Sequence, residues 1–280
     1  MFKKFLTALG VCVLVCFSFY YTESAVNIAI KNDPIMKEII KVSKDYEKEA
    51  VDAILVNNNI IPGISGEVVD IDRSYESMKR YGEFNSSLLV FKEVIPSVNV
   101  TNNYDKYITS GNQNNMSVSL VFKVVNTNYI KDIIEVLEDK EVKAVFFLHE
   151  SIFEDNDEIL RLIFLSGNSI ELYSDDYTSL SIGKNNRILS AINMKKLNYC
   201  YTEYENSKVL DICSKEKLHT IIPSVITGAS PYMDVKKGVN NGSIIMLNNN
   251  ASVVGELKAI INYIVQKGKK IELLEDLLAE

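Results

Sequence analysis

The chain of 280 residues is poor in histidine and cysteine, with two of the former and four of the latter. Catalytic metal sites are usually built from two or three imidazole, thiolate or carboxylate ligands, so two histidines restrict the sites that this chain can form. Four cysteines are too few for the disulfide framework on which small secreted domains depend. The fold must therefore rest on a hydrophobic core, and a chain of this length can bury one.

Positive charge is also scarce. Lys and Arg number 30 against 37 Asp and Glu, which gives a formal net charge of −7, and the basic residues form no cluster. Because proteins bind phosphate backbones through clustered basic side chains, nucleic acid is excluded as a partner. With 47% hydrophobic and 24% charged residues, the composition is that of a folded soluble chain, which excludes a disordered, a collagen-like or a polytopic membrane protein.

Residues 1–25 differ from the rest of the chain. Lys3 and Lys4 precede an uncharged run from Phe5 to Thr22, and Glu23 is the first acidic residue. This order is typical of an export signal, and the run lies between the length of a cleaved signal peptide and the ~20 residues of a spanning helix. We therefore keep two interpretations, signal peptide or membrane anchor. Both predict an extracytoplasmic protein of a bacterium, either membrane-anchored or secreted.

Cys200 and Cys213 are the two cysteines of the exported part. They are able to pair in an oxidising compartment. Since a single pair does not make a framework, we expect free, half-buried thiols.

Residues 26–110 predict a small α+β domain. Asp33 and Pro34 are residues that begin a helix, and apolar residues recur at spacings of three and four up to residue 56. A strand over 68–71, a helix over 72–81 that ends at Gly82, and a strand over 88–91 follow. The polar stretch 109–116 has the composition of a linker, and we place the domain boundary there.

Residues 117–280 alternate between short apolar strands and helical stretches, which is typical of βα units. We expect strands at 118–124, 142–148, 169–172, 198–201, 220–222 and 243–247, with a short closing strand and helix in 270–278, and helices at 129–139, 157–165, 185–195, 207–217 and 252–267. The pattern predicts an α/β barrel or near-barrel. Functional sites of such folds lie at the carboxyl ends of the strands.

Five segments in this region resemble the polysaccharide deacetylases of the NodB type. They are Leu120-Val121-Phe122, Val142–Phe147, Gly167–Leu180, Asn241–Leu247 and Gly268–Leu274. The resemblance implies a deformed (β/α) barrel of polysaccharide-deacetylase type over residues 117–280, preceded by the small α+β domain and the N-terminal hydrophobic segment. It also implies an activity: removal of an acetyl group from a carbohydrate by a divalent metal that one Asp and two His hold, with an Asp as base and a His as acid.

The positions that carry this chemistry in the family hold other residues here. The base falls at Lys123, the metal-binding Asp at Val124, the two metal-binding histidines at Tyr173 and Tyr177, the Arg-containing segment at Cys200 and the acid His at Asn248. All of these motifs are degenerate. Because these residues are replaced, we expect no catalytic residue, metal or cofactor in this chain, and we favour a pseudoenzyme.

Aromatic residues at the same strand ends suggest a binding role. Tyr173, Tyr177, Tyr201 and His149 are candidate contacts to a glycan, since sugar rings stack on aromatic faces; simple packing is the alternative. His149 with Asp175 and Asp176 is a second arrangement of donors that suits a metal.

We predict a protein that binds an envelope polysaccharide or peptidoglycan, or serves as an envelope scaffold. The alternatives are a divergent de-N-acetylase or esterase with a rebuilt site, and a protein whose N-terminal domain does the work while the barrel is a spacer.

Overall fold

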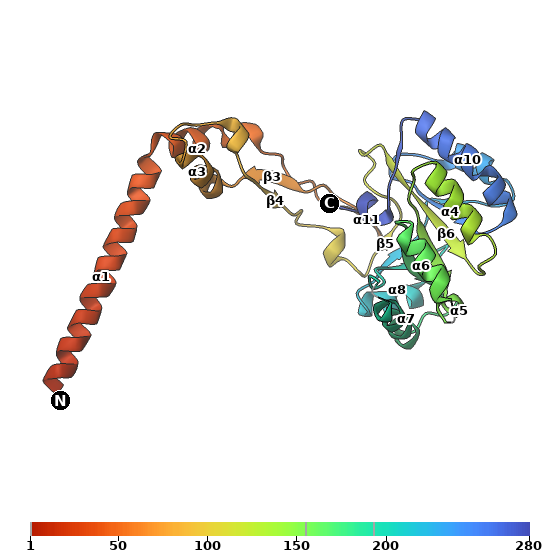
Figure 1. Cartoon of the computed structure of the whole chain (residues 1–280), viewed down its shortest axis with the longest axis horizontal. Coiled ribbons are helices and arrows are strands. Elements are labelled where there is room, and N and C mark those ends of the chain that lie inside the picture. Colours follow the sequence, from red (N-terminus) through yellow and green to blue (C-terminus); the bar gives the residue numbers. More distant parts are fainter. Residues whose placement is uncertain (1, 155, 193) are drawn as a thin grey trace. The chain divides into compact units, whose positions relative to one another are not determined.

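The computed structural model describes residues 2–154, 156–192 and 194–280 (Figure 1). The chain divides into two compact units, one of residues up to Ala50 together with Ser65–Val94, and one of Val51–Ile64 together with Ile95–Glu280. The predicted division into 26–110 and 117–280 follows different boundaries and stays a prediction.

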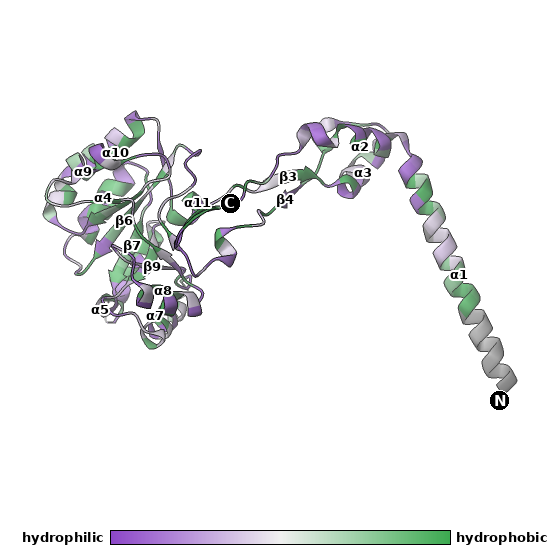
Figure 2. Ribbon diagram, turned by 180° about the vertical axis from the view of Figure 1, so that it is seen from behind, coloured by the Kyte–Doolittle hydropathy of each residue, from purple (hydrophilic) through white to green (hydrophobic). Residues whose placement is uncertain are grey.

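The smaller unit begins with the long helix α1 (Phe2–Asn32). Its part Val13–Asn32, 20 residues with a mean hydropathy of 1.4, is apolar and long enough to cross a membrane. Green, hydrophobic residues line much of it in Figure 2. Signal sequences meet the same criterion, so signal peptide and anchor both stay predictions for residues 1–25, of which Met1 lies outside the described residues.

Helix α2 (Pro34–Tyr46) begins as its sequence predicts. The Asp33 carboxylate accepts a hydrogen bond from the Ile35 N–H at 2.8 Å, and Pro34 is the first helical residue. Helix α3 (Ile71–Lys79) is capped in the same way by Asp70, and the antiparallel strands β3 (Gly66–Val69) and β4 (Phe91–Val94) complete the unit. Its core consists of Ile35, Met36, Ile39, Val69, Tyr75, Met78 and Leu89.

Two predicted elements of this region are wrong. The helix expected up to residue 56 ends at Tyr46, because the Lys48 and Val51 N–H groups donate instead to the carbonyls of Glu67 and Ile64, each at 2.8 Å. The strand expected over 88–91 begins only at Phe91, because Ser86–Leu88 forms a 3₁₀ turn that Asn85 caps. In both places a distant partner or a side-chain cap competed successfully with the local pattern.

Within the described residues, the larger unit contains an eleven-stranded sheet in the order β1-β2-β5-β10-β9-β8-β7-β6-β12-β11, with β13 paired to β6. Strands β1 and β2 are antiparallel, and the remaining pairs are parallel. The strands are β1 Ile54–Val56, β2 Asn59–Ile61, β5 Tyr107–Ile108, β6 Ser117–Val124, β7 Val145–His149, β8 Ser169–Tyr173, β9 Tyr199–Tyr201, β10 His219–Ile221, β11 Val225–Ile226, β12 Ile244–Asn248 and β13 Lys270–Ile271.

Helices alternate with these strands, and Figure 1 shows α4, α6 and α10 side by side over the sheet. They are α4 Ile130–Asp139, α5 Glu150–Phe153, α6 Asp157–Leu165, α7 Ser179–Ala191, α8 Ser207–Lys215, α9 Pro231–Gly238, α10 Ala251–Gln266 and α11 Leu274–Leu277. A curled parallel sheet with helices outside is the half-barrel of the polysaccharide-deacetylase fold, so the predicted fold class is confirmed.

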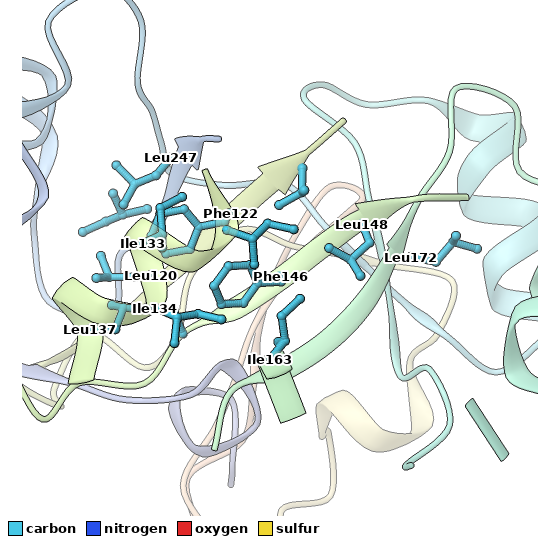
Figure 3. Packing of buried hydrophobic residues seen from close by; sticks show 14 of the residues in the cluster. Leu120, Phe122, Ile133, Ile134, Leu137, Phe146, Leu148, Ile163, Leu172 and Leu247 are labelled. Atoms are coloured by element: carbon cyan, nitrogen blue, oxygen red, sulfur yellow. The ribbon is translucent and has the colours of Figure 1, made fainter. Parts of the chain in front are cut away.

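The side chains of β6 alternate between two layers. Leu120, Phe122 and Val124 belong to the cluster that the outer helices cover, whereas Val121 belongs to the cluster on the other face. The Phe122 and Phe146 rings stack with their centroids 5.1 Å apart. Figure 3 shows them against isoleucines of α4 and α6. This alternation is the period-two pattern of a strand buried on both faces.

Three further expectations need correction. Helix α7 begins at Ser179 instead of 185, because the Thr178 and Ser181 side chains form a capping box; residue 193, near its predicted end, lies outside the described residues. The stretch 109–116 is packed in its first part, where residues 110–112 are buried and the Asn112 amide donates to the Pro62 carbonyl at 3.0 Å, whereas residues 113–116 are exposed. Cys200 and Cys213 form a disulfide, where we expected free thiols.

The disulfide joins β9 to α8 and generates the first prediction. Replacement of Cys213 by Ser should lower the free energy of unfolding by roughly 3 kcal/mol, because the cross-link restricts a short loop of the unfolded chain. Denaturant titration of the purified protein measures the change. The control is Cys16→Ser, which removes an exposed free thiol and should have little effect. Cys200 or Cys213 reacting with a thiol reagent in the denatured, unreduced protein would contradict the assignment.

Candidate functional site

A cavity of about 200 Å³ opens at the carboxyl ends of β6, β8 and β9. Its walls combine aromatic rings with charged and polar groups. They are Lys123, Tyr173, Ser174, Asp175, Tyr177, Tyr201, Thr202, Glu203, Tyr204, Asn206 and Val209. The location is the edge of the sheet at which parallel folds place their sites.

Lys123 is the central cation of this cavity. Its Nζ lies 2.8 Å from Glu203 Oε1, 4.6 Å from the centroid of the Tyr173 ring and 5.8 Å from that of Tyr201. Burial alone would lower the pKa of Lys123, but the hydrogen bond to Glu203 and the neighbouring Tyr173 raise it above its ordinary value. The same hydrogen bond lowers the pKa of Glu203. Both groups are therefore charged at neutral pH.

Tyr177 and Tyr201 form the buried floor. The Tyr177 hydroxyl donates to the Leu172 carbonyl at 2.8 Å and accepts from the Tyr201 N–H at 3.0 Å, so it joins the ends of β8 and β9. The Tyr201 side chain is also buried; burial and the nearby Glu203 carboxylate raise the pKa of its hydroxyl, yet among the described residues the hydroxyl makes no hydrogen bond of good geometry. A buried hydroxyl that lacks a partner is costly unless a ligand or water pairs with it.

His149 and Asp175 lie at the rim. His149 Nε2 is 3.7 Å from Asp175 Oδ2, and its ring centroid is 5.7 Å from that of Tyr173. The Tyr173 hydroxyl donates to the same carboxylate. The strand register explains why the His149 and Tyr173 rings lie close together, because the two residues are paired at the ends of β7 and β8.

The six degenerate positions separate into three groups. Lys123, Tyr173 and Tyr177 line the cavity. Val124 and Cys200 are fully buried in the outer cluster, as the alternation along the strands requires. Asn248 is the register partner of Lys123, and its amide donates to the Thr227 carbonyl at 2.9 Å.

The metal that the family resemblance implies does not fit these residues. The three positions that hold the metal in the family carry an aliphatic side chain, Val124, and two phenols, Tyr173 and Tyr177, in place of a carboxylate and two imidazoles. Among the described residues, no three His, Cys, Asp or Glu side chains lie close enough to hold a metal ion, and this includes His149 with Asp175 and Asp176.

Sequence reasoning missed the role of Glu203. It lies 80 positions from Lys123, and the ion pair follows from the parallel sheet, which brings the ends of β6 and β9 to the same edge. A sequence signal was present, because a lysine at a buried strand end needs a carboxylate nearby.

The ion pair predicts a pH-dependent stability. Glu203→Gln should cost about 0.5 kcal/mol at pH 7, a modest value because Glu203 is 43% exposed. The lowered pKa of Glu203 means that its contribution is present above the unfolded value of 4.5 and disappears as the pH falls below it. Because the pKa of Lys123 is raised above its ordinary 10.5, the stabilisation by the ion pair is lost on the alkaline side only as the pH rises beyond 10.5.

Chemical unfolding of parent and variant between pH 3 and pH 9 measures this difference, with the exposed Glu205→Gln as control. A cost that persists undiminished at pH 3 would mean that packing, not charge, is responsible.

Residues 110–199 match the family model of polysaccharide deacetylases. A curated relative, YlxY of Bacillus subtilis (strain 168), is described as uncharacterized; it is 25% identical over 279 residues, which cover 92% of this chain and 88% of the relative.

Two solved structures are similar over nearly the whole chain. Wild-type BA3943 of Bacillus anthracis, described as a CE4 family pseudoenzyme, is 26% identical with a TM-score of 0.66, covering 89% of this chain and 96% of that one. A BA3943 mutant described as having restored enzymatic activity is also 26% identical, with a TM-score of 0.67 and coverages of 88% and 98%. The family model and the two pseudoenzyme structures thus identify in this chain a domain of the polysaccharide deacetylase (NodB-like) family whose catalytic motifs are degenerate.

Proposed function

We propose that this protein is a non-catalytic member of its family that binds a glycan of the bacterial cell envelope. The observation that carries the proposal is the Lys123–Glu203 ion pair, which lies between the rings of Tyr173 and Tyr201 at the ends of the strands. This arrangement puts a fixed cation and aromatic surface where the family resemblance implies a base and a metal.

The chemistry of Lys123 argues against turnover. A general base must be unprotonated, whereas the raised pKa of Lys123 keeps it protonated at neutral pH. Acid and base groups contribute about 10² to 10⁴ each in rate, and the metal several kcal/mol of charge stabilisation. The loss of all of them leaves no useful turnover, although such effects do not simply add.

The same residues suit a sugar. Tyr173 and the 71% exposed Tyr204 present rings at the opening, while the unpartnered Tyr201 hydroxyl and the Lys123–Glu203 pair offer donors and acceptors. We assign sugar contacts to Tyr173, Tyr201 and His149. Tyr177, which is 1% exposed, supports the floor beneath them.

The relatives support this proposal. BA3943 is described as a pseudoenzyme and a mutant of it as having restored activity, which suggests that a backbone of this kind survives the loss of the catalytic side chains. Location is part of the proposal. The apolar helix α1 and the disulfide both suit a protein that stands outside the cytoplasmic membrane, held there by residues 1–25 or secreted.

Glycan binding without hydrolysis is the expected result for the purified protein. Chitooligosaccharides or peptidoglycan fragments should bind in calorimetric titration, and Tyr173→Ala should weaken binding about tenfold, the loss of one stacking contact. Tyr81→Ala, which removes an exposed ring of the smaller unit, is the matched control. No acetate should be released, with or without a chelator.

Two results would refute the proposal. One is acetate release that stops with a chelator or with His149→Ala, which would favour the divergent deacetylase. The other is glycan binding that Tyr173→Ala leaves intact.

Membrane association is expected if α1 acts as an anchor. The protein should then fractionate with membranes, and residues 26–280 should be sensitive to protease in protoplasts, because Lys3 and Lys4 keep the amino end inside. A soluble form that begins near Ala25 would show that the segment is a cleaved signal peptide. Recovery in the cytosol would contradict export.

A further inference from the structure

A second cavity, of about 260 Å³, opens at the opposite edge of the sheet, beside the amino ends of β8 and β9. Its apolar walls include Phe164, Leu189, Met194 and Leu273, and the charged residues Lys195, Lys196 and Glu275 also line it. Glu171, in the middle of β8, also lines it. The volume is below the roughly 300 Å³ at which pockets for drug-sized ligands begin, so the cavity suits a small molecule or one side chain.

Glu171 is the unusual feature of this cavity, because its side chain is only 3% exposed. Its Oε2 accepts hydrogen bonds from the N–H groups of Asn198 and Tyr199, each at 2.9 Å. Its Oε1 has no hydrogen-bond partner among the described residues. A carboxylate accepts about four hydrogen bonds, so half of its capacity is unused beside a cavity.

Burial acts on the same group, since it raises the pKa of Glu171 to about 8. A buried carboxylate that lacks a cation either takes up a proton or is stabilised by a positive ligand. The two lysines that line the cavity, Lys195 and Lys196, are both exposed, and among the described residues neither forms an ion pair with Glu171; Lys195 lies 3.4 Å from Glu275 instead.

We propose that this cavity binds a primary alkylammonium group, with the ammonium on Glu171 Oε1 and the hydrocarbon chain along the apolar walls. Above the raised pKa of Glu171, where the group is ionised, an anion would be repelled by it and a neutral alcohol would leave its charge unpaired. A guanidinium fits less well, because it binds best to both oxygens of a carboxylate, and Oε2 is already occupied by two N–H groups.

Two sources supply this chemistry: a free short-chain amine, and a lysine-like side chain of a peptide. The geometry at Glu171 is the same for both. The proposal is independent of glycan binding, which involves the opposite ends of the strands.

The test is calorimetric titration of the full chain in detergent with n-pentylammonium at pH 8.5. We expect saturable binding with a Kd on the order of 1 mM, a realistic affinity for six non-hydrogen atoms. Glu171→Gln should weaken binding at least tenfold, and Glu216→Gln, a matched change at an exposed site, should not. Pentanol and pentanoate should not bind.

A second variant keeps the test decisive if Glu171→Gln does not fold. Met194→Trp fills the cavity while Glu171 remains, and it should abolish binding. Binding of Nα-acetyl-lysine methylamide as well as pentylammonium would identify a peptide side chain as the source, and pentylammonium alone would identify a free amine. No saturable binding by the parent, equal binding of pentanol, or binding that survives both variants would overturn the proposal. Titration of the same samples with glycan shows whether the cavity at the carboxyl ends of the strands still binds, so that a failure of this proposal is distinguished from a failure of glycan binding.

Discussion

The alternation of side chains along the parallel strands is the constraint on which the rest of the structure depends. In β6, Phe122 turns outward and stacks on Phe146 beneath the helices, so the next residue, Lys123, must turn to the other face. A shift of register by one residue would exchange them and bury an ammonium under α4 and α6. The apolar outer layer therefore fixes the position of the charged group, and the cavity is a consequence of the core.

At the carboxyl ends of the strands, an ion pair and aromatic residues stand where the family has metal-binding and acid–base residues. An ammonium that a carboxylate neutralises can stay in a partly buried place at modest cost, whereas a divalent ion needs several converging anionic or imidazole ligands. The substitutions are mutually consistent: Lys123 with Glu203 satisfies charge, and Tyr177 with Tyr201 fills volume and bonds the backbone. The outward-facing Val124 and Cys200 became part of the core.

The sequence predicted the elements whose signal is local. The apolar runs of β6, β7, β8 and β12 and the cap at Asp33 appear where their residues indicate, whereas Asp70, expected inside a strand, caps helix α3. Features that depend on distant partners were out of reach. Strands β1, β2 and β5 are short and gain their place only by pairing, Glu203 acquires its role from a residue 80 positions away, and the disulfide needs the proximity of β9 and α8.

The join between β8 and β9 has a mechanical consequence. Within the described residues the ladder between these strands consists of one pair, Leu172 with Cys200. Side chains make the other connections: Glu171 accepts a hydrogen bond from the start of β9, and Tyr177 accepts one from its end. Two strands that are joined mainly by side-chain hydrogen bonds separate more easily than two strands with a continuous backbone ladder. Local opening of the sheet should therefore begin between β8 and β9. The two cavities lie at the two ends of this strand pair. The sheet is thus most easily deformed between the two strands whose ends open to solvent.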